Sequence, residues 1–177
     1  MCSQAIDEVL TSTDAKILDL GAGKGQIGKQ LSEHGYTEIY GQEGSYAKKQ
    51  ILMQKGHYRD IESFIVGSQP LPRTYRKAFD VVTCAGGLGT NLLPAKCFND
   101  MLSALKPRGY AIFTVSQKHL KHENSFNMRY IDQIEMLMEE GKWHPLVHNK
   151  FIKYHHIQLG AVNMSGEPFS LLIFQKQ

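Results

Sequence analysis

The stretch Ile17-Leu18-Asp19-Leu20-Gly21-Ala22-Gly23-Lys24-Gly25-Gln26-Ile27-Gly28 predicts the centre of the fold. Residues 17–20 form a mostly apolar run that is too short for a helix and typical of a buried strand. Alternating glycines follow, and then Ile27 and Leu31 recur at helical spacing. A strand, a glycine-rich turn and a helix in this order predict a loop for a nucleotide-type ligand. Glycines let a ligand approach the backbone, and the first N–H groups of the helix have no internal partners.

Strand-like and helix-like segments alternate along the chain, which predicts an α/β fold in one domain over residues 1–177. The expected strands are 17–20, 38–41, 61–66, 79–84, 110–116, 145–158 and 169–175. The expected helices are 3–12, 24–34, 45–55, 94–105 and 126–140. The last two strands have no helix between them, so we expect them to form an antiparallel hairpin at the edge of a mostly parallel sheet.

Two nucleotide loops fit the glycine pattern in part. Gly23-x-x-x-x-Gly28-Lys29 matches seven positions of a P-loop, but Gln30 stands where Ser or Thr would hold magnesium. Gly23-x-Gly25-x-x-Gly28 followed by Glu43 matches a dinucleotide-binding fingerprint. The chain is short for a dehydrogenase with its own substrate domain, and its sequence presents no obvious catalytic pair for hydride transfer.

A third interpretation accounts for more of the chain. Residues 17–25, 39–45, 79–84 and 102–110 resemble, in order, four motifs of the class I S-adenosylmethionine-dependent methyltransferases. The last of them, Leu102 to Tyr110, is similar to the Leu-Lys-Pro-Gly-Gly entry to their fifth strand. Residues 35–41, 71–72 and 81–88 most resemble the methyltransferase-like proteins associated with the Williams–Beuren chromosomal region. The resemblance implies a Rossmann-like, doubly wound sheet of seven strands, mostly parallel, with an antiparallel C-terminal edge hairpin.

The resemblance also implies S-adenosylmethionine as the cofactor and a set of residues that bind it. These are Asp19, Gly21, Ala22, Gly23, Gly25, Glu43, Gly44, Ser68, Cys84 and Ala85. The methionine end would lie over residues 21–25, with Asp19 near its amino group. Glu43 would accept both ribose hydroxyls, since a carboxylate is a natural bidentate acceptor. The adenine would lie between residues 67–69 and the end of the fourth strand near Cys84. Gly28 is interpreted as a close-packing position.

The chain departs from the family pattern at two places. Many relatives carry an Asp shortly before the Leu-Pro pair, whereas here Ser68 or Gln69 would have to meet the adenine amine. Only about fifteen residues precede the first strand, so we expect an incomplete N-terminal lid and a possible protein partner that completes it. The alternative function is therefore a catalytically inactive methyltransferase-like subunit that binds the cofactor or a protein partner.

The sequence assigns no catalytic residue. His119 and His122 follow the fifth parallel strand, where a base could act, but the same residues also fit a solvated loop. His155 and His156 alternate along an expected strand, so they cannot both line one pocket. The histidines have no Cys or carboxylate at ligand spacing, so no metal site is predicted.

Composition limits the partners. The net charge is +3, which gives no nucleic-acid footprint and favours a small molecule or a protein as the methyl acceptor. Three cysteines without a Cys-x-x-Cys pair indicate a reducing compartment. The sequence shows no signal peptide and no apolar run long enough to span a membrane. We therefore expect a cytoplasmic protein, with the nucleus as the other open location, and no membrane partner.

Overall fold

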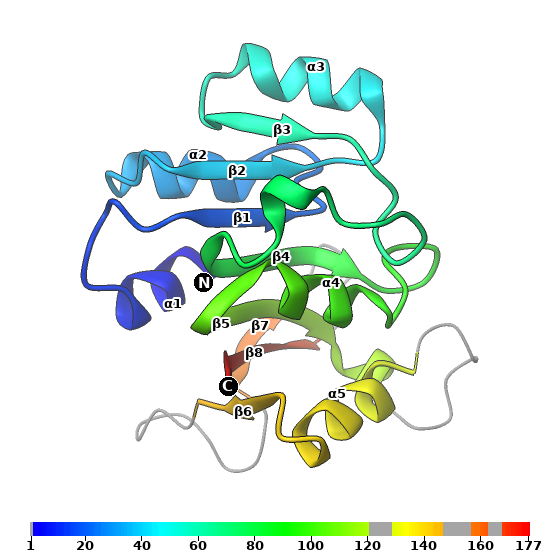
Figure 1. The fold of residues 1–177 in the computed structure, drawn as a ribbon. Coiled ribbons are helices and arrows are strands. Elements are labelled where there is room, and N and C mark those ends of the chain that lie inside the picture. The colour runs from blue at the N-terminus through cyan, green and yellow to red at the C-terminus, as the bar shows by residue number, and fades with distance from the viewer. Residues whose placement is uncertain (1, 121–128, 147–156, 163–167) are drawn as a thin grey trace.

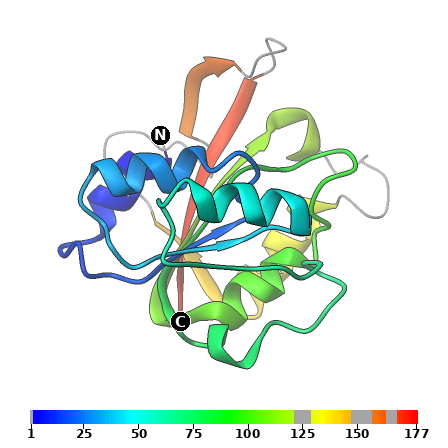
Figure 2. The same ribbon diagram turned by 90° about the horizontal axis from the view of Figure 1, so that it is seen from above.

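The structure is a computed structural model that describes residues 2–120, 129–146, 157–162 and 168–177. One mixed sheet forms its centre, with helices on both faces (Figures 1 and 2). The strands are β1 (Ile17–Leu20), β2 (Ile39–Gln42), β3 (Asp60–Glu62), β4 (Phe79–Leu88), β5 (Leu105–Ser116), β6 (Trp143–Pro145), β7 (Ile157–Val162) and β8 (Pro168–Lys176). The helices are α1 (Cys2–Val9), α2 (Gln26–Glu33), α3 (Tyr46–Gln54), α4 (Cys97–Ala104) and α5 (Tyr130–Glu139). Two 3₁₀ turns, η1 (Arg73–Tyr75) and η2 (Gln117–Leu120), complete the described elements.

The sheet order confirms the predicted Rossmann-like topology. Strands β3, β2, β1, β4 and β5 are adjacent and parallel, in that order, so their carboxyl ends share one edge (Figure 1). β8 runs antiparallel beside β5. β6 and β7 both pair antiparallel with the other side of β8, β6 near the end of that strand and β7 near its start. These two short strands therefore share the seventh, edge position of the sheet.

Two apolar clusters hold the helices to the sheet. On one face, Leu18, Val82 and Phe113 pack with α4, α5 and the ring of Trp143. On the other face, Ile17 and Val81 pack with α1, α2 and α3. Figure 2 shows α1 and α2 on the opposite side of the sheet from α4. Both faces of the central strands are covered, which explains why these strands read as continuous apolar runs.

Several predicted boundaries shift. The glycines of residues 85–90 predict a second turn, but pairing with β5 continues β4 to Leu88, with a register irregularity between Cys84 and Leu88. Residues 106–109, also expected as a turn, lie inside β5 as an irregularity at which Arg108 has φ 63°. The expected strand 145–158 is two strands, and residues 147–156 between them lie outside the described residues, as does the start of the expected helix 126–140. Ser45 caps α3 as predicted, because its Oγ accepts a hydrogen bond from the Lys48 N–H at 3.4 Å.

Candidate functional site

The glycine loop, residues 21–25, connects β1 to α2 at the carboxyl edge of the sheet. Gly21, Gly23 and Gly25 have φ values of 73°, 56° and 76°, a region that other residues rarely adopt. Two side chains at the end of β2 accept hydrogen bonds from the backbone of this loop. The Gly21 N–H donates to Gln42 Oε1 at 3.0 Å, and the Gly23 N–H donates to Glu43 Oε2 at 3.0 Å. The loop is thus tied to the end of β2 by hydrogen bonds as well as by strand pairing.

Glu43 is positioned so that both of its carboxylate oxygens are partly used. Oε2 accepts the Gly23 N–H, and Oε1 accepts the Ser45 N–H at 2.9 Å. The residue is only 8% exposed. A carboxylate offers about four acceptor positions, so each oxygen keeps capacity for one further donor. Glu43 could therefore accept two hydroxyls of one ligand while it stays fixed by the backbone.

Asp19 is buried beneath the loop and has a protein partner. It is 2% exposed, and the Tyr58 hydroxyl donates to Asp19 Oδ2 at 2.6 Å. The same hydroxyl accepts the Gly28 N–H at 3.2 Å. Burial raises the pKa of Asp19 to about 6, and the hydrogen bond from Tyr58 opposes this rise. This position makes Asp19 a buried anchor of the loop.

Two glycines of the loop region are needed for close packing. A Cβ on Gly28 would lie 2.2 Å from Tyr58 Cζ, and a Cβ on Gly25 would lie 2.6 Å from Leu52 Cδ2. The interpretation of Gly28 as a packing position agrees with this geometry. A Cβ on Gly23, by contrast, would meet no heavy atom closer than Gly21 O at 3.7 Å. The side of the loop at Gly23 therefore has room for a ligand.

The remaining predicted cofactor residues lie in two places. Ala22 and Gly44 are next to the contacts just described: the Ala22 N–H donates to Gln42 O at 2.8 Å, and Gly44 directly follows Glu43. Ser68 lies apart from them, exposed on the turn after β3.

The last two predicted cofactor residues, Cys84 and Ala85, lie near the end of β4. Cys84 is fully buried, and burial raises the pKa of its thiol well above the usual range, which suits packing and not nucleophilic attack. Its neighbour Ala85 is partly buried and lines a cavity.

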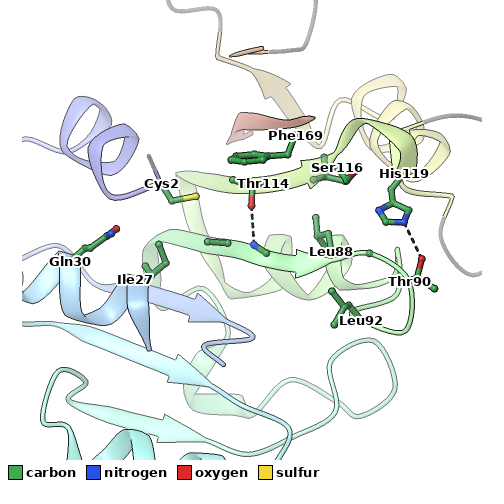
Figure 3. A pocket seen from close by; sticks show the side chains of 14 residues that line it. Cys2, Ile27, Gln30, Leu88, Thr90, Leu92, Thr114, Ser116, His119 and Phe169 are labelled. Atoms are coloured by element: carbon green, nitrogen blue, oxygen red, sulfur yellow. Dashed lines mark hydrogen bonds between the residues drawn. The ribbon is translucent and has the colours of Figure 1, made fainter. Parts of the chain in front are cut away.

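That cavity, the β4–β5 cavity, has a volume of about 610 Å³ and lies at the carboxyl ends of β4 and β5 (Figure 3). α1 and α2 contribute Cys2, Ile27 and Gln30 to its wall, and Phe169 of β8 closes one side. Its size is in the usual range for sites that bind small molecules. The sequence did not predict this cavity, because its walls come from six separate elements and from the segment after β4.

His119 and Thr90 meet at one end of the β4–β5 cavity. His119 Nε2 and Thr90 Oγ1 are 3.1 Å apart (Figure 3), and His119 is 7% exposed. Of the two interpretations of His119, the structure contradicts the solvated loop and places the residue in a cavity wall. His122, His155 and His156 lie outside the described residues.

The segment after β4 is held by Tyr130 of α5. The Gly89 N–H donates to the Tyr130 hydroxyl at 3.0 Å, and that hydroxyl donates to Leu93 O at 2.6 Å. The Leu93 N–H in turn donates to Gly87 O at 3.0 Å. A Cβ on Gly21 would lie 3.5 Å from Leu93 Cδ1, so this segment reaches the glycine loop. The β4–β5 cavity and the glycine loop are therefore neighbours along the same edge.

Sequence reasoning missed three site residues. Gln42 stood in the motif 39–45 without a role of its own, although an amide at a strand end next to Glu43 could have suggested a loop contact. Tyr58 lies in a stretch, 57–68, whose pattern predicted little. Thr90 received no role, and its pairing with His119 spans 29 residues, so no local pattern indicates it.

Within the described ranges, no three His, Cys, Asp or Glu side chains gather as a possible metal site. No helix among the described residues is both long and apolar enough to cross a bilayer.

Comparison with known proteins agrees with this geometry. Human methyltransferase-like protein 27 is 27% identical over 137 residues, which are 75% of this chain and 53% of that protein. The chain thus spans about half the length of this curated relative. A TehB-like SAM-dependent methyltransferase from Corynebacterium glutamicum has a TM-score of 0.65 at 21% identity, over 99% of this chain and 87% of that one.

Two more solved structures share the fold. A SAM-dependent methyltransferase from Methanosarcina mazei has a TM-score of 0.66 at 15% identity, over 97% of this chain and 96% of that one. The 4+2 cyclase SpnF has a TM-score of 0.67 at 15% identity, over 98% and 79%. Because SpnF is named as a cyclase, the fold alone does not specify the reaction. The model of the methyltransferase domain family matches residues 2–157, which is most of the chain. The chain belongs to the methyltransferase domain family.

Proposed function

We propose that the chain binds S-adenosylmethionine at the glycine loop and transfers the sulfonium methyl group to an acceptor at the neighbouring β4–β5 cavity. Membership of the family implies this cofactor. The observation that carries the proposal is the geometry of Glu43, which holds the Gly23 and Ser45 N–H groups and keeps one acceptor position on each oxygen. That arrangement fits the two hydroxyls of a ribose. The open side of Gly23 fits the approach of the rest of the ligand.

The bound sulfonium supplies an activated methyl group and a good leaving group. The chain's own residues then have to bind, align and exclude water. Glu43 would hold the ribose, and the glycine loop would accept the methionine end without steric hindrance. We assign Gly44, Ser68, Cys84 and Ala85 to the adenine side of the same site. Asp19 would act through its support of the loop.

Further parts of the proposal concern the setting of the protein. We infer a small molecule or a protein as acceptor, and place the chain near the methyltransferase-like proteins associated with the Williams–Beuren chromosomal region, on the segments 35–41 and 81–88. Three buried free cysteines suit a reducing compartment such as the cytoplasm. We infer that a protein partner would complete the N-terminal lid beside α1. Failure of the isolated chain to bind the cofactor, in the experiment described next, would favour this alternative.

Titration calorimetry with S-adenosylmethionine and with S-adenosylhomocysteine tests the proposal on the whole chain. Glu43→Ala should weaken binding more than tenfold, about 1.4 kcal/mol, since it removes both diol acceptors. Glu62→Ala is the matched control, because that carboxylate is at the end of β3, is partly exposed and, among the described residues, has one ion pair, a 4.0 Å contact with Lys49. Thermal unfolding of both variants shows whether the fold persists. Absence of binding by the wild-type chain would overturn the proposal and favour the inactive or partner-dependent alternative.

A further inference from the structure

We infer that the β4–β5 cavity takes an uncharged, largely apolar small molecule with a hydroxyl group, such as a phenol, and that Thr90 and His119 accept the proton of that hydroxyl during methyl transfer. This inference rests on the proposed function, because it names the acceptor class and the proton acceptor of the same site. The lining of the cavity and the contact between the two side chains support it, as does the segment that carries Thr90, because that segment reaches the glycine loop at Leu93.

The lining of the β4–β5 cavity is apolar and carries no fixed charge within the described part of the chain. Ile27, Leu88, Leu92, Val115 and Phe169 supply most of its apolar side chains. Its described lining contains no Asp, Glu, Lys or Arg. An acceptor amine is a cation near neutral pH and would find no carboxylate there, and an acceptor carboxylate would find no basic group. Because burying an unpaired charge is costly, the cavity favours an uncharged acceptor.

Most polar side chains of the cavity lie toward one end in Figure 3, namely Thr90, Ser116 and His119. Gln30 lies at the other end, where its Oε1 accepts a hydrogen bond from Ser3 Oγ at 3.1 Å. Thr114 lies between the two ends, two residues before Ser116 in β5. Thr114 Oγ1 is engaged, because it accepts the Gly86 N–H at 2.9 Å. Ser116 Oγ is buried and has no hydrogen-bond partner among the described residues. A ligand with one polar group would therefore place that group at this end and its apolar body toward Phe169 and Ile27.

Thr90 and His119 have the geometry of a hydroxyl paired with a base. With Nε2 unprotonated, the Thr90 hydroxyl donates to it across the 3.1 Å contact, and Thr90 Oγ1 remains an acceptor for a ligand hydroxyl. The His119 ring is held edge-on against Tyr130, with centroids 6.5 Å apart and planes at 85°. Tyr130 also holds Gly89 and Leu93, so one side chain fixes both partners of the pair.

The proposed methyl transfer conserves atoms and electrons. The O–H bond of the acceptor breaks and its proton passes to Thr90 Oγ1, while the proton of Thr90 passes to His119 Nε2. The acceptor oxygen forms the new O–CH₃ bond as the S–CH₃ bond of S-adenosylmethionine breaks. The electron pair of that bond stays on sulfur, which leaves neutral S-adenosylhomocysteine. His119 ends the step as imidazolium and returns the proton to solvent.

A purely structural pair is the competing explanation, because a Thr–His hydrogen bond can simply join the segment after β4 to η2. The two explanations differ in how they depend on the acidity of the acceptor. A structural pair lowers turnover of every acceptor equally when it is removed. A proton-accepting pair matters for an undissociated hydroxyl and much less for one that is already ionised.

Binding of three probes with matched ring systems tests the acceptor class. 2-Naphthol, 2-naphthoate and 2-naphthylmethylamine share one ring system and differ in charge. With the whole chain and S-adenosylhomocysteine, we expect 2-naphthol to bind at least tenfold more tightly than either charged probe. Equal binding of the three probes, or preference for a charged one, would overturn the acceptor class. If S-adenosylhomocysteine itself does not bind, the proposed function fails instead, and the three probes are compared on the free chain.

Turnover of two acceptors tests the pair. His119→Gln and Thr90→Val should lower kcat for 2-naphthol at pH 7.5 by about 100-fold or more, the usual contribution of a general base. Both variants should lower kcat much less for 4-nitrophenol, because its hydroxyl is far more acidic and loses its proton with less help from a base. Thr90→Ser should keep most activity, and His144→Gln is the matched control because His144 is exposed on β6. Thr90 is exposed, so its variants test the pair even if His119→Gln unfolds. Equal losses for the two acceptors, or no loss with Thr90→Val, would overturn the role.

Discussion

The glycine loop and the β4–β5 cavity lie side by side along one edge of the sheet, yet they are built in opposite ways. The loop is crowded from beneath, where Tyr58 and Leu52 fill the space beside Gly25 and Gly28. The cavity is open, and a Cβ on Gly86 would meet nothing within 4 Å. Under the proposed function, the rigid glycine loop would bind the cofactor, which the family shares. The more open cavity would bind the acceptor, which varies. Loops at strand ends commonly carry such variation.

The largest expected effect tests the crowding of the loop. Gly28→Ala should lower the free energy of unfolding by about 3 kcal/mol, because the new methyl group would overlap Tyr58, whose hydroxyl is pinned between Asp19 and the Gly28 N–H. Gly86→Ala is the control from the cavity side, where only the cost of φ 72° applies, about 1 kcal/mol. Urea denaturation measures both. Equal losses would show that the loop is no more tightly packed than the cavity wall.

Local pattern is the reason that the glycine loop could be predicted from the sequence. Strand, glycines and helix follow one another within residues 17–34, and Glu43 directly follows the very next strand, so adjacent pairing brings it to Gly23. The pairings of β1 with β2, β2 with β3 and β4 with β5 follow for the same reason, since one helix connects each pair. The place of β4 beside β1 was implied only by the family resemblance. The family model then agreed with what the four motifs had indicated.

Contacts between distant segments explain what could not be predicted. Tyr58 reaches Asp19 across 39 residues from a stretch without clear periodicity. The glycines after Cys84 indicated a turn, but pairing with β5 keeps these residues in β4 up to Leu88. The cavity combines Cys2, Gln30 and Phe169, which no local pattern relates. Residues that meet only through the completed fold leave little trace in a single sequence.

The second prediction concerns how the free energy of unfolding depends on pH. The described lining of the cavity has no carboxylate, so the dependence comes from the loop region, where Asp19 is buried. Burial raises the pKa of Asp19 from 3.8 to about 6, so between these values the folded chain binds more protons than the unfolded chain. Asp19 therefore contributes stability at low pH that is lost as the pH rises through 6. We expect this contribution to fall by about 2 kcal/mol between pH 4.5 and 7.

Asp19→Asn should remove that dependence, so the difference in unfolding free energy between wild type and variant should change by this amount across the same pH range. Tyr58→Phe removes the hydrogen bond that favours the ionised form, and should extend the decline to higher pH. Urea denaturation at a series of pH values measures both variants. Parallel curves for wild type and Asp19→Asn would contradict the raised pKa of Asp19.

The smallest expected effect tests how loosely the cavity wall is held. Thr114→Val keeps the shape of the side chain but removes the acceptor for the Gly86 N–H, at 2.9 Å in the wild type. Gly86 is exposed, so water can replace that bond, and the free energy of unfolding should fall by only about 1 kcal/mol. Thr114→Ser keeps the hydroxyl and should lose less, as measured by urea denaturation of all three chains. If serine costs more than valine, the methyl packing of Thr114 holds the wall, and the contrast with the hydrogen-bonded glycine loop becomes sharper still. If valine costs as much as Gly28→Ala, the two regions are equally rigid and the contrast between them fails.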